Sequence, residues 1–552
     1  MSEDLIQSPL LHLSDNRQVN NLLNDIVEKL KDYTEDQVRH LNQLAKIGVA
    51  LSGTRNLDQL LEMIVDEARA FTDSDGGTLY LVTDDGASLR YSIVQNETLN
   101  MRMGVAAGQP IPWPALPLKV DGLLNNSSVS AYAANSGEMV EIQDVYEATG
   151  FNFEGARKAD ERNNYRSKSM LVIPMRDHEN EVIGVLQLIN ARDPETRETI
   201  PFAAEFRELT AALASQAAVA ITTARLIRDM QNLFEAFIQA IAKAIDEKSP
   251  YTGGHISRVS NLTMEIAKRV NEEGEGLFPR GKFSDDEMYE LRLAAWLHDT
   301  GKITTPEHVI DKHTKLETIF DRMELVRIRF DLAISQAKLR AAEEKLGGDE
   351  YLTPEQIANV DRLKEEFKFV SGCNATQEFV RDEVIVRLDA IAAEAIETIN
   401  GTETMLAPDE LYNLHIRKGN LTTEERKIIE NHALMTIKIL EQLPFPKKIK
   451  NVPAIAGAHH EKLSGKGYPL GLKGDEINLQ SRIMALADIF EALTARDRPY
   501  KQPKKLSECI KILNFMVKDE ELDPIVVQFF LDNKMHIDYA KQHLNPDQID
   551  VE

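Results

Sequence analysis

Histidines and aspartates with metal-binding chemistry recur in the second half of this 552-residue chain. Of its 13 histidines, eight lie between His255 and His460. Any one of them could be a hydrogen-bonded core histidine, and a single aspartate could cap a helix. Five imidazoles and two carboxylates on separate, mostly apolar segments need a common partner, because burying such groups unpaired is costly. The candidate metal ligands are His255, His298, Asp299, His432, His459, His460 and Asp488.

A ligand set of this kind indicates both the metals and the reaction. Mixed nitrogen and oxygen ligands in this number suit two borderline ions such as iron or manganese. Two adjacent ions that share a carboxylate can clamp and cleave a phosphoester. The pair His459-His460 also precedes a turn that contains Gly465, Gly467 and Pro469, and such a turn is rigid, open backbone. This stretch is either a ligand pocket beside a metal or a plain helix end followed by a loop.

Mostly apolar helices must position these side chains. Each predicted helix places one ligand or one ligand pair within it or at its end. Gly301 follows the first apolar run and is a common helix terminator. The predicted elements are the apolar run before His298, residues 425–441 around His432, a short helix before His459, residues 485–493 around Asp488, and a helix that begins near His255.

The composition narrows the possible partners and compartment. The formal charge is -25, from 64 basic and 89 acidic residues, and this disfavours DNA or RNA as a partner. An anionic substrate would need a local positive site. Two cysteines, Cys373 and Cys509, cannot form a disulfide framework, which fits the cytoplasm. The N-terminus lacks the pattern of a signal peptide, and we expect no membrane-spanning helix.

The first half of the chain predicts an α+β unit at about 40–225. A helix is expected at 57–71, where apolar residues recur at helical spacing. Strands are then expected in two hairpins, because short β-branched and apolar runs flank polar turns. They lie at 77–82, 89–94, 170–175 and 182–190. An antiparallel sheet flanked by helices accommodates this order.

A long helix is predicted at 205–245. Its apolar residues recur every three or four positions without Pro or Gly, and about 40 residues would extend ~60 Å. The alternatives are a parallel homodimer seam, which we favour, and a helix that packs back onto its own domain. In the first case this linker helix joins the two halves of each chain within a dimer.

The first half resembles a GAF domain, the small-molecule sensor fold, most of all those of cyclic-nucleotide phosphodiesterases. The resemblance rests on residues 125–134, 142–146, 165–175 and 182–190. It implies a sensor that binds a small ligand such as a cyclic nucleotide, or one that only dimerises and relays. Phe153 and Asp160-Glu161 are present but wrongly spaced for the nucleotide-binding signature of some relatives.

The second half resembles an HD-GYP phosphodiesterase. The resemblance rests on ordered motifs, which are His298-Asp299-Thr300-Gly301-Lys302, His459-His460-Glu461, Gly467-Tyr468-Pro469, residues 471–477, Arg482-Ile483 and residues 487–501. It implies metal-dependent hydrolysis of the bacterial second messenger cyclic di-GMP to linear pGpG, GMP or both. Two alternatives stay open: a non-catalytic scaffold that binds cyclic dinucleotides, and a phosphodiesterase for another cyclic dinucleotide such as cyclic GMP-AMP.

The resemblance also implies roles for individual residues. Asp299 would bridge two metal ions, and Lys302 would contact the scissile phosphate. Gly467 and Tyr468 would form part of the pocket wall. Arg498 and Lys501 would hold the second phosphate, which supplies the positive site that an acidic protein needs.

The chain departs from the family's pattern at three places, one of which is Ser464, where many members carry an acidic or amide residue. Members with three metals carry Glu four residues before the first histidine, where Tyr251 stands here, so we expect two ions. An insertion at about 316–418 separates the Lys302 loop from the helix of His432. Helical patterns at 319–346 and 354–399 predict a helical hairpin. It could be a lid, a dimer arm, a docking surface or a passive addition.

The predicted architecture is therefore multidomain, an α+β GAF sensor followed by an all-α HD-GYP domain. The expected parts are a helical lead-in at 1–37, the GAF domain at 38–228, the linker helix at 229–245, the HD-GYP domain at 246–535 and a tail at 536–552.

Overall fold

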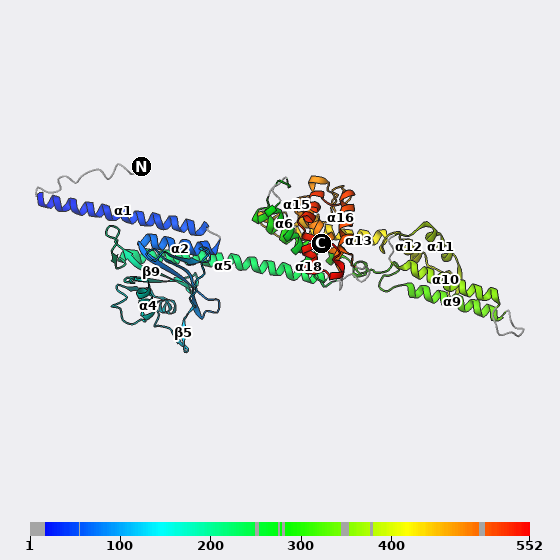
Figure 1. Ribbon diagram of the computed structural model, residues 1–552, viewed down its shortest axis with the longest axis horizontal. Coiled ribbons are helices and arrows are strands. Elements are labelled where there is room, and N and C mark those ends of the chain that lie inside the picture. The colour runs from blue at the N-terminus through cyan, green and yellow to red at the C-terminus, as the bar shows by residue number, and fades with distance from the viewer. Residues whose placement is uncertain are drawn as a thin grey trace. The chain divides into compact units, whose positions relative to one another are not determined.

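The computed structural model describes residues 17–53, 56–248, 253–273, 276–278, 282–343, 353–375, 379–495 and 503–551. The chain divides into two compact units, Met1–Asn232 and Leu233–Glu552. Each unit is described by itself (Figure 1). The domain boundaries predicted from the sequence stay predictions.

An antiparallel sheet forms the centre of the first unit. Within the described residues it has eight strands, in the order β3-β2-β1-β9-β8-β7, with β4 paired to β2 and β10 to β9. The four strands predicted from alternation are confirmed as β1, β2, β8 and β9. The strands are β1 Ser74–Val82, β2 Ser88–Asn96, β3 Met101–Gly104, β4 Leu116–Pro117, β7 Val140–Ile142, β8 Met170–Arg176, β9 Val182–Arg192 and β10 Thr199–Ile200, with a separate pair β5 Lys119–Val120 and β6 Leu123–Leu124.

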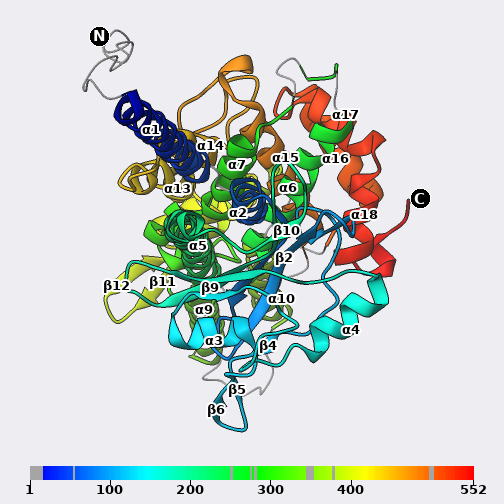
Figure 2. The same ribbon diagram turned by 90° about the vertical axis from the view of Figure 1, so that its left-hand side faces the viewer.

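Helices cover both faces of this sheet. Helix α2 (Leu57–Thr72) begins where Asn56 accepts hydrogen bonds from the backbone N–H groups of Asp58 and Gln59. It packs with the first part of α5 (Ala204–Asp246) on one face. Helix α3 (Val129–Ser136) lies on the opposite face from α2 (Figure 2), where a second apolar cluster forms. The α+β prediction is confirmed.

The first described helix extends past the predicted lead-in. Helix α1 runs without interruption over Arg17–Gly53. The predicted end of the helical lead-in, at residue 37, therefore falls inside one element. On the α3 side of the sheet, α4 (Glu154–Asn163) contains Asp160 of the incomplete nucleotide signature. The buried Asp160 carboxylate accepts hydrogen bonds from Ser167 and Tyr146, so it fastens the end of α4.

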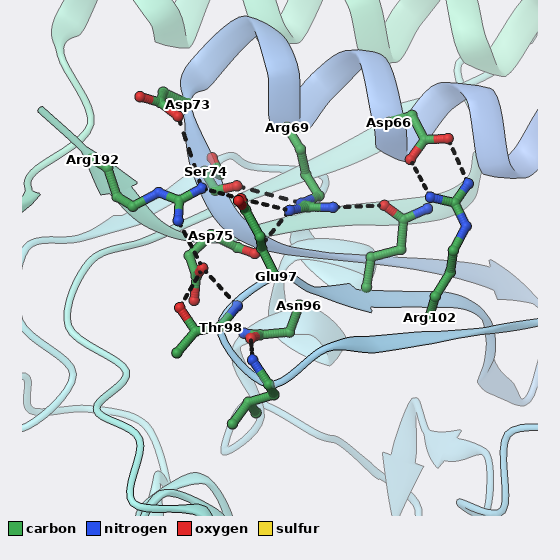
Figure 3. A network of polar contacts seen from close by, with 12 residues as sticks. Asp66, Arg69, Asp73, Ser74, Asp75, Asn96, Glu97, Thr98, Arg102 and Arg192 are labelled. Carbon is green, nitrogen blue, oxygen red and sulfur yellow. Dashed lines mark hydrogen bonds and ion pairs between the residues drawn. The ribbon is translucent and has the colours of Figure 1, made fainter. Parts of the chain in front are cut away.

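A network of charged side chains joins the ends of three neighbouring strands, β2, β1 and β9 (Figure 3). Asp75 on β1 is buried, with 2% exposure, and lies 3.1 Å from Arg192 at the end of β9. The Asp75 carboxylate also accepts hydrogen bonds from Thr98 and from the Tyr165 hydroxyl. Arg69 of α2 donates to the Gln95 side chain and to the carbonyl oxygen of Asp75. The network joins α2 to β1, β2 and β9. It also supplies the buried Asp75 carboxylate with hydrogen bonds and a positive partner.

Helix α5 confirms the long helix predicted at 205–245. Leu213, Ala217 and Ile221 pack in the core of the first unit, and Ile238 packs in that of the second. Between these ends the helix exposes apolar side chains, namely Leu226, Met230, Leu233 and Phe237, with exposed fractions of 60%, 66%, 71% and 63%. Among the described residues, Phe206–Asp246 is the one stretch long and apolar enough to cross a membrane by length and composition, a test that core helices also pass.

The second unit is largely helical, as predicted. Outside the insertion, its two large apolar clusters lie around α6, α15 and the C-terminal helices and around α7 and α14. The elements outside the insertion are α6 His255–Glu273, α7 Asp285–Leu297, η1 Thr300–Thr304, α8 Glu307–Ile310, α13 Thr423–Leu440, η2 Lys447–Ile449, α14 Val452–Gly457, η3 Gly474–Glu476, α15 Leu479–Thr494, α16 Leu506–Lys518, α17 Pro524–Asp532, α18 Met535–His543 and η4 Pro546–Gln548.

The insertion begins as the predicted hairpin and then differs from it. Helices α9 (Met323–Glu343) and α10 (Pro354–Asn374) pack together, but the helix predicted at 354–399 ends at Asn374. A third helix, a β-hairpin and a short helix follow, namely α11 Asp382–Ala392, β11 Ala395–Thr398, β12 Gly401–Thr404 and α12 Pro408–Leu414. Gly401 has a φ of 106° directly after the two-residue turn, a conformation that glycine adopts without strain. The prediction of one helix over 354–399 was wrong because a helical pattern resumes in α11, so the break after Asn374 does not show in the sequence.

One face of α9 stays exposed. The exposed fractions are 40%, 54%, 37% and 59% for the apolar side chains of Leu325, Ile328, Leu332 and Leu339. Ile334 does pack against the core of the insertion.

Candidate metal centre

The seven predicted ligands converge from five segments of the second unit. Each segment places its ligand at or near a helix end, or on a buried face. His255 is the first residue of α6, His298 and Asp299 lie between α7 and η1, His432 lies in α13, His459 and His460 follow α14, and Asp488 lies in α15. All are buried except His460, which is half-buried.

The ligand atoms form two groups. In the first group are His255, His298 and Asp299, and in the second are His432, His459 and His460, with the atoms of each group within 4.8 Å of one another. Asp299 contacts both groups. Its Oδ2 lies 3.5 Å from His255 Nε2 and 3.3 Å from His298 Nε2, while its Oδ1 lies 3.4 Å from His432 Nε2. A carboxylate placed in this way can bridge two ions.

Asp488 completes the first group. Its Oδ1 lies 3.3 Å from His255 Nε2, so this imidazole nitrogen faces two carboxylates. The predicted ligand set is therefore brought together in full.

Three of the imidazoles are held in one tautomer. The Nδ1 atoms of His298, His432 and His459 lie 2.8, 2.5 and 2.6 Å from the carbonyl oxygens of the residues three positions earlier. A carbonyl only accepts, so Nδ1 carries the hydrogen and Nε2 presents a lone pair. Within the described part of the chain, these three buried Nε2 atoms have no hydrogen-bond partner.

This arrangement fits metal ions and little else. Two of the Nε2 lone pairs point at Asp299, so acceptor faces acceptor at 3.3–3.4 Å. A cation between them would turn this repulsion into attraction and would satisfy the buried nitrogens. The donor set of imidazole nitrogens and carboxylate oxygens suits iron, manganese or zinc more than calcium or magnesium.

Burial and mutual repulsion keep the second histidine group neutral. Burial lowers the pKa of His432 and brings that of His460 to about 4. Burial, together with the neighbouring His460 and His298, also lowers the pKa of His459. Burial alone would raise the pKa of Asp299, but Lys302 and His298 outweigh it and hold the pKa well below its usual range. Neutral imidazoles and an ionised carboxylate are the forms that bind metals.

Glu491 is a functional residue that sequence reasoning missed. It lies on α15 one turn after Asp488 and is fully buried. Its carboxylate lies 2.5 Å from His255 Nδ1 and also accepts a hydrogen bond from Arg258 at 2.7 Å. Burial alone would lower the pKa of His255, but Glu491, Asp299 and Asp488 raise it well above its usual value. A second acidic residue at i+3 from Asp488 in an apolar helix was the available signal.

Close packing fixes the segment η1, which contains Lys302. A Cβ atom on Gly301 would lie 1.9 Å from the carbonyl oxygen of His432, so only glycine fits there. The Gly301 N–H donates to the Thr436 hydroxyl, which in turn donates to the carbonyl oxygen of His298. The Lys302 ammonium lies 2.6 Å from Asp299 Oδ2. The predicted phosphate contact of Lys302 stays a prediction.

Glu461 shapes the glycine-rich turn. Its buried carboxylate accepts three backbone hydrogen bonds, from Leu470, Gly471 and Leu472. A Cβ atom on Gly467 would lie 2.4 Å from the backbone nitrogen of Lys462, so this close approach also requires glycine. The turn brings the Tyr468 ring to 4.8 Å from the His460 ring. Tyr468 therefore lies beside the second histidine group, where a pocket wall was predicted.

Three residues that bear on the predicted site lie outside the described residues. They are Arg498 and Lys501, the predicted contacts of the second phosphate, and Tyr251, which stands at the position of the additional glutamate.

Domain family models match both halves of the chain. The GAF domain family matches residues 56–221, and HD domain families match residues 252–366 and 393–526. The chain therefore combines a GAF domain with an HD domain, and the resemblances seen in the sequence are confirmed at this level.

Three curated relatives illustrate the similarity, all from Vibrio cholerae. A probable cyclic di-GMP phosphodiesterase is 39% identical over 24% of this chain and 30% of its own length. The 3'3'-cGAMP-specific phosphodiesterase 3 is 26% identical over 50% of this chain and 35% of its own. The 3'3'-cGAMP-specific phosphodiesterase 1 is 30% identical over 44% of this chain and 54% of its own length. The matched stretches thus span between about a third and a half of these relatives.

The contact between Glu491 and His255 predicts an effect on metal affinity. In Glu491→Gln the charge that orients His255 is lost, and we expect metal affinity to fall about tenfold or more. Competition with a chromophoric chelator measures it. Glu441→Gln, which removes an exposed carboxylate after α13, is the matched control and should bind metal like the parent. Equal affinities in both variants would contradict the role of Glu491.

Proposed function

We propose that the protein is an HD-GYP phosphodiesterase that hydrolyses cyclic di-GMP to linear pGpG, GMP or both. The observation that carries this proposal is the position of Asp299 between two groups of imidazoles, three of which present buried, unpaired Nε2 atoms. The names of the relatives, which include cyclic di-GMP phosphodiesterases from Vibrio cholerae and Thermotoga maritima, support the substrate class.

The proposal assigns the ligands to two ions, iron or manganese. His255, His298, Asp299 and Asp488 would hold one, and His432, His459, His460 and Asp299 would hold the other. When bound, such ions supply Lewis acidity to the phosphate and lower the pKa of water.

The chain's own residues contribute binding and charge. Lys302 is within reach of the site through its contact with Asp299, and its ammonium would neutralise charge that develops on the phosphate. Tyr468 would stack against a base, since its ring already lies beside His460. Arg498 and Lys501 would hold the second phosphate. Hydrolysis adds water to one phosphorus, breaks its bond to the ribose 3′ oxygen and returns a proton to that oxygen.

A second substrate has a specific observation in its favour. The relatives named 3'3'-cGAMP-specific phosphodiesterases match 50% and 44% of this chain, more than the 24% matched by the probable cyclic di-GMP phosphodiesterase. Cyclic GMP-AMP is therefore the alternative substrate. The other alternative is a non-catalytic scaffold that binds a cyclic dinucleotide without turnover.

Turnover of both dinucleotides by the full chain tests the proposal. Anaerobically purified protein, loaded with Fe(II) or Mn(II), should cleave cyclic di-GMP faster than cyclic GMP-AMP. Asp299→Ala should lose at least a thousandfold of the rate, because it removes the bridging carboxylate, and chelation should abolish turnover. Asp547→Ala removes an exposed carboxylate and is the control.

Each outcome of this assay has a meaning. Faster cleavage of cyclic GMP-AMP would select the alternative substrate. Binding of cyclic di-GMP without product under either metal would overturn the proposed activity in favour of the scaffold.

We further propose that the GAF domain regulates the enzyme within a cytoplasmic homodimer formed through α5. The exposed residues Leu226, Met230, Leu233 and Phe237 recur at alternating spacings of four and three, which is typical of a coiled-coil seam. Small ligands such as cyclic nucleotides would then act on the HD domain through this helix. The Asp160 contacts described above assign that residue to the fold of the GAF domain rather than to a ligand.

Light scattering after gel filtration tests the dimer. Leu233→Glu places a charge in the seam and should convert the dimer to a monomer, because a desolvated charge opposes the contact. Gln231→Glu adds the same charge at an exposed position two residues away and should leave the mass unchanged. A parent chain that elutes as a monomer would refute the seam.

A further inference from the structure

Lys248 connects the end of the linker helix to the segment that contains Lys302. It lies two residues beyond α5, and its ammonium donates to three backbone carbonyl oxygens. The acceptors are Lys302 at 3.1 Å, Ile303 at 2.7 Å and Thr305 at 2.7 Å. An ammonium has three hydrogens, so this one is fully used by a single turn of backbone.

The turn that Lys248 holds is part of the metal centre. Asp299 is the N-cap of η1, and Lys302 lies in its middle. One side of η1 is fixed by Gly301 and Thr436 against α13. The C-terminal side instead borders an open cleft of about 640 Å³, which Lys248 lines together with Ile303, Thr304 and Thr305. Ile303 is 58% exposed on that side, and the charge-assisted hydrogen bonds of Lys248 restrain its backbone.

The end of α5 also contacts the segment of His255. Ala242 and Ile245 pack against Ile256 in a small apolar cluster. The Asp246 carboxylate accepts a hydrogen bond from the backbone N–H of Ile256, the residue after His255. The last turn of the linker helix and the two residues after it thus contact both α6 and η1, the elements on the two sides of the first ligand group.

We propose that Lys248 is a positioning residue, which sets η1 and thereby orients Lys302 and Asp299 for the reaction. A shift of the end of α5 changes the length of three hydrogen bonds and moves η1 with it. A displacement of about 1 Å in such a segment can reduce a rate a hundredfold. In this way the linker helix reaches the reacting groups through one side chain. The kinetic consequence rests on the proposed phosphodiesterase activity, whereas the restraint on the backbone of η1 does not.

Lys248→Met in the full chain tests this role. It keeps the length of the side chain and removes the donors, and we expect kcat for cyclic di-GMP to fall about tenfold to a hundredfold with KM within about twofold. Metal content should equal that of the parent. Lys243→Met removes an exposed ammonium from the same helix and should leave kcat unchanged. Lys248→Arg retains the charge and N–H donors, so it should recover part of the lost rate.

Hydrogen exchange provides a readout that does not depend on activity. The amides of Lys302 and Thr305, which donate within the turn, should exchange at least tenfold faster in Lys248→Met than in Lys243→Met. Peptides from α13 should exchange as in the parent. Parent-like exchange at these two amides would overturn the proposal, as would parent-like kcat. If the parent cleaves neither dinucleotide, the proposed function fails, and exchange alone decides whether Lys248 restrains η1.

Discussion

The structure of the second unit depends on how buried imidazole lone pairs are satisfied. His298, His432 and His459 each donate from Nδ1 to a carbonyl oxygen within their own segment, which leaves Nε2 directed into the protein. Two of these lone pairs face the ionised Asp299. Burying three unpaired acceptors costs several kcal/mol, and the facing carboxylate adds repulsion. Bound metal ions would remove both costs. The surrounding helices must therefore hold the imidazoles and Asp299 where such ions can bind them.

The elements around the centre are arranged to keep these ligands in place. Helix ends deliver His255, His298 and the pair His459-His460, so the backbone itself fixes where each imidazole begins. Glu491 and Glu461 are buried carboxylates that accept hydrogen bonds from the surrounding protein. The first orients His255, and the second holds the glycine-rich turn beside His460. Such contacts orient the metal-binding side chains and thereby tune the affinity for metal.

Sequence reasoning reached the main elements because they repeat over many residues. The strands β1, β2, β8 and β9 and the helix α5 follow from alternation and helical spacing. The ligand set followed from residue types together with a family resemblance. The sequence marks Glu491 only by its spacing from Asp488, because its partner His255 lies far away in the chain. The role of Lys248 could not be predicted, since it depends on contacts with a segment more than 50 residues away. The break after α10 was missed because one helical pattern leads into another.

The metal content of the anaerobically purified chain decides whether these residues form a metal centre. We expect two transition-metal ions per chain, measured by inductively coupled plasma mass spectrometry against protein mass from amino-acid analysis. We also expect Asp299→Asn, which keeps the shape of the side chain but weakens the bridge between the two ligand groups, to retain fewer ions. A folded parent chain that holds no such ion after exposure to Fe(II), Mn(II) and Zn(II) would contradict a metal centre at this place.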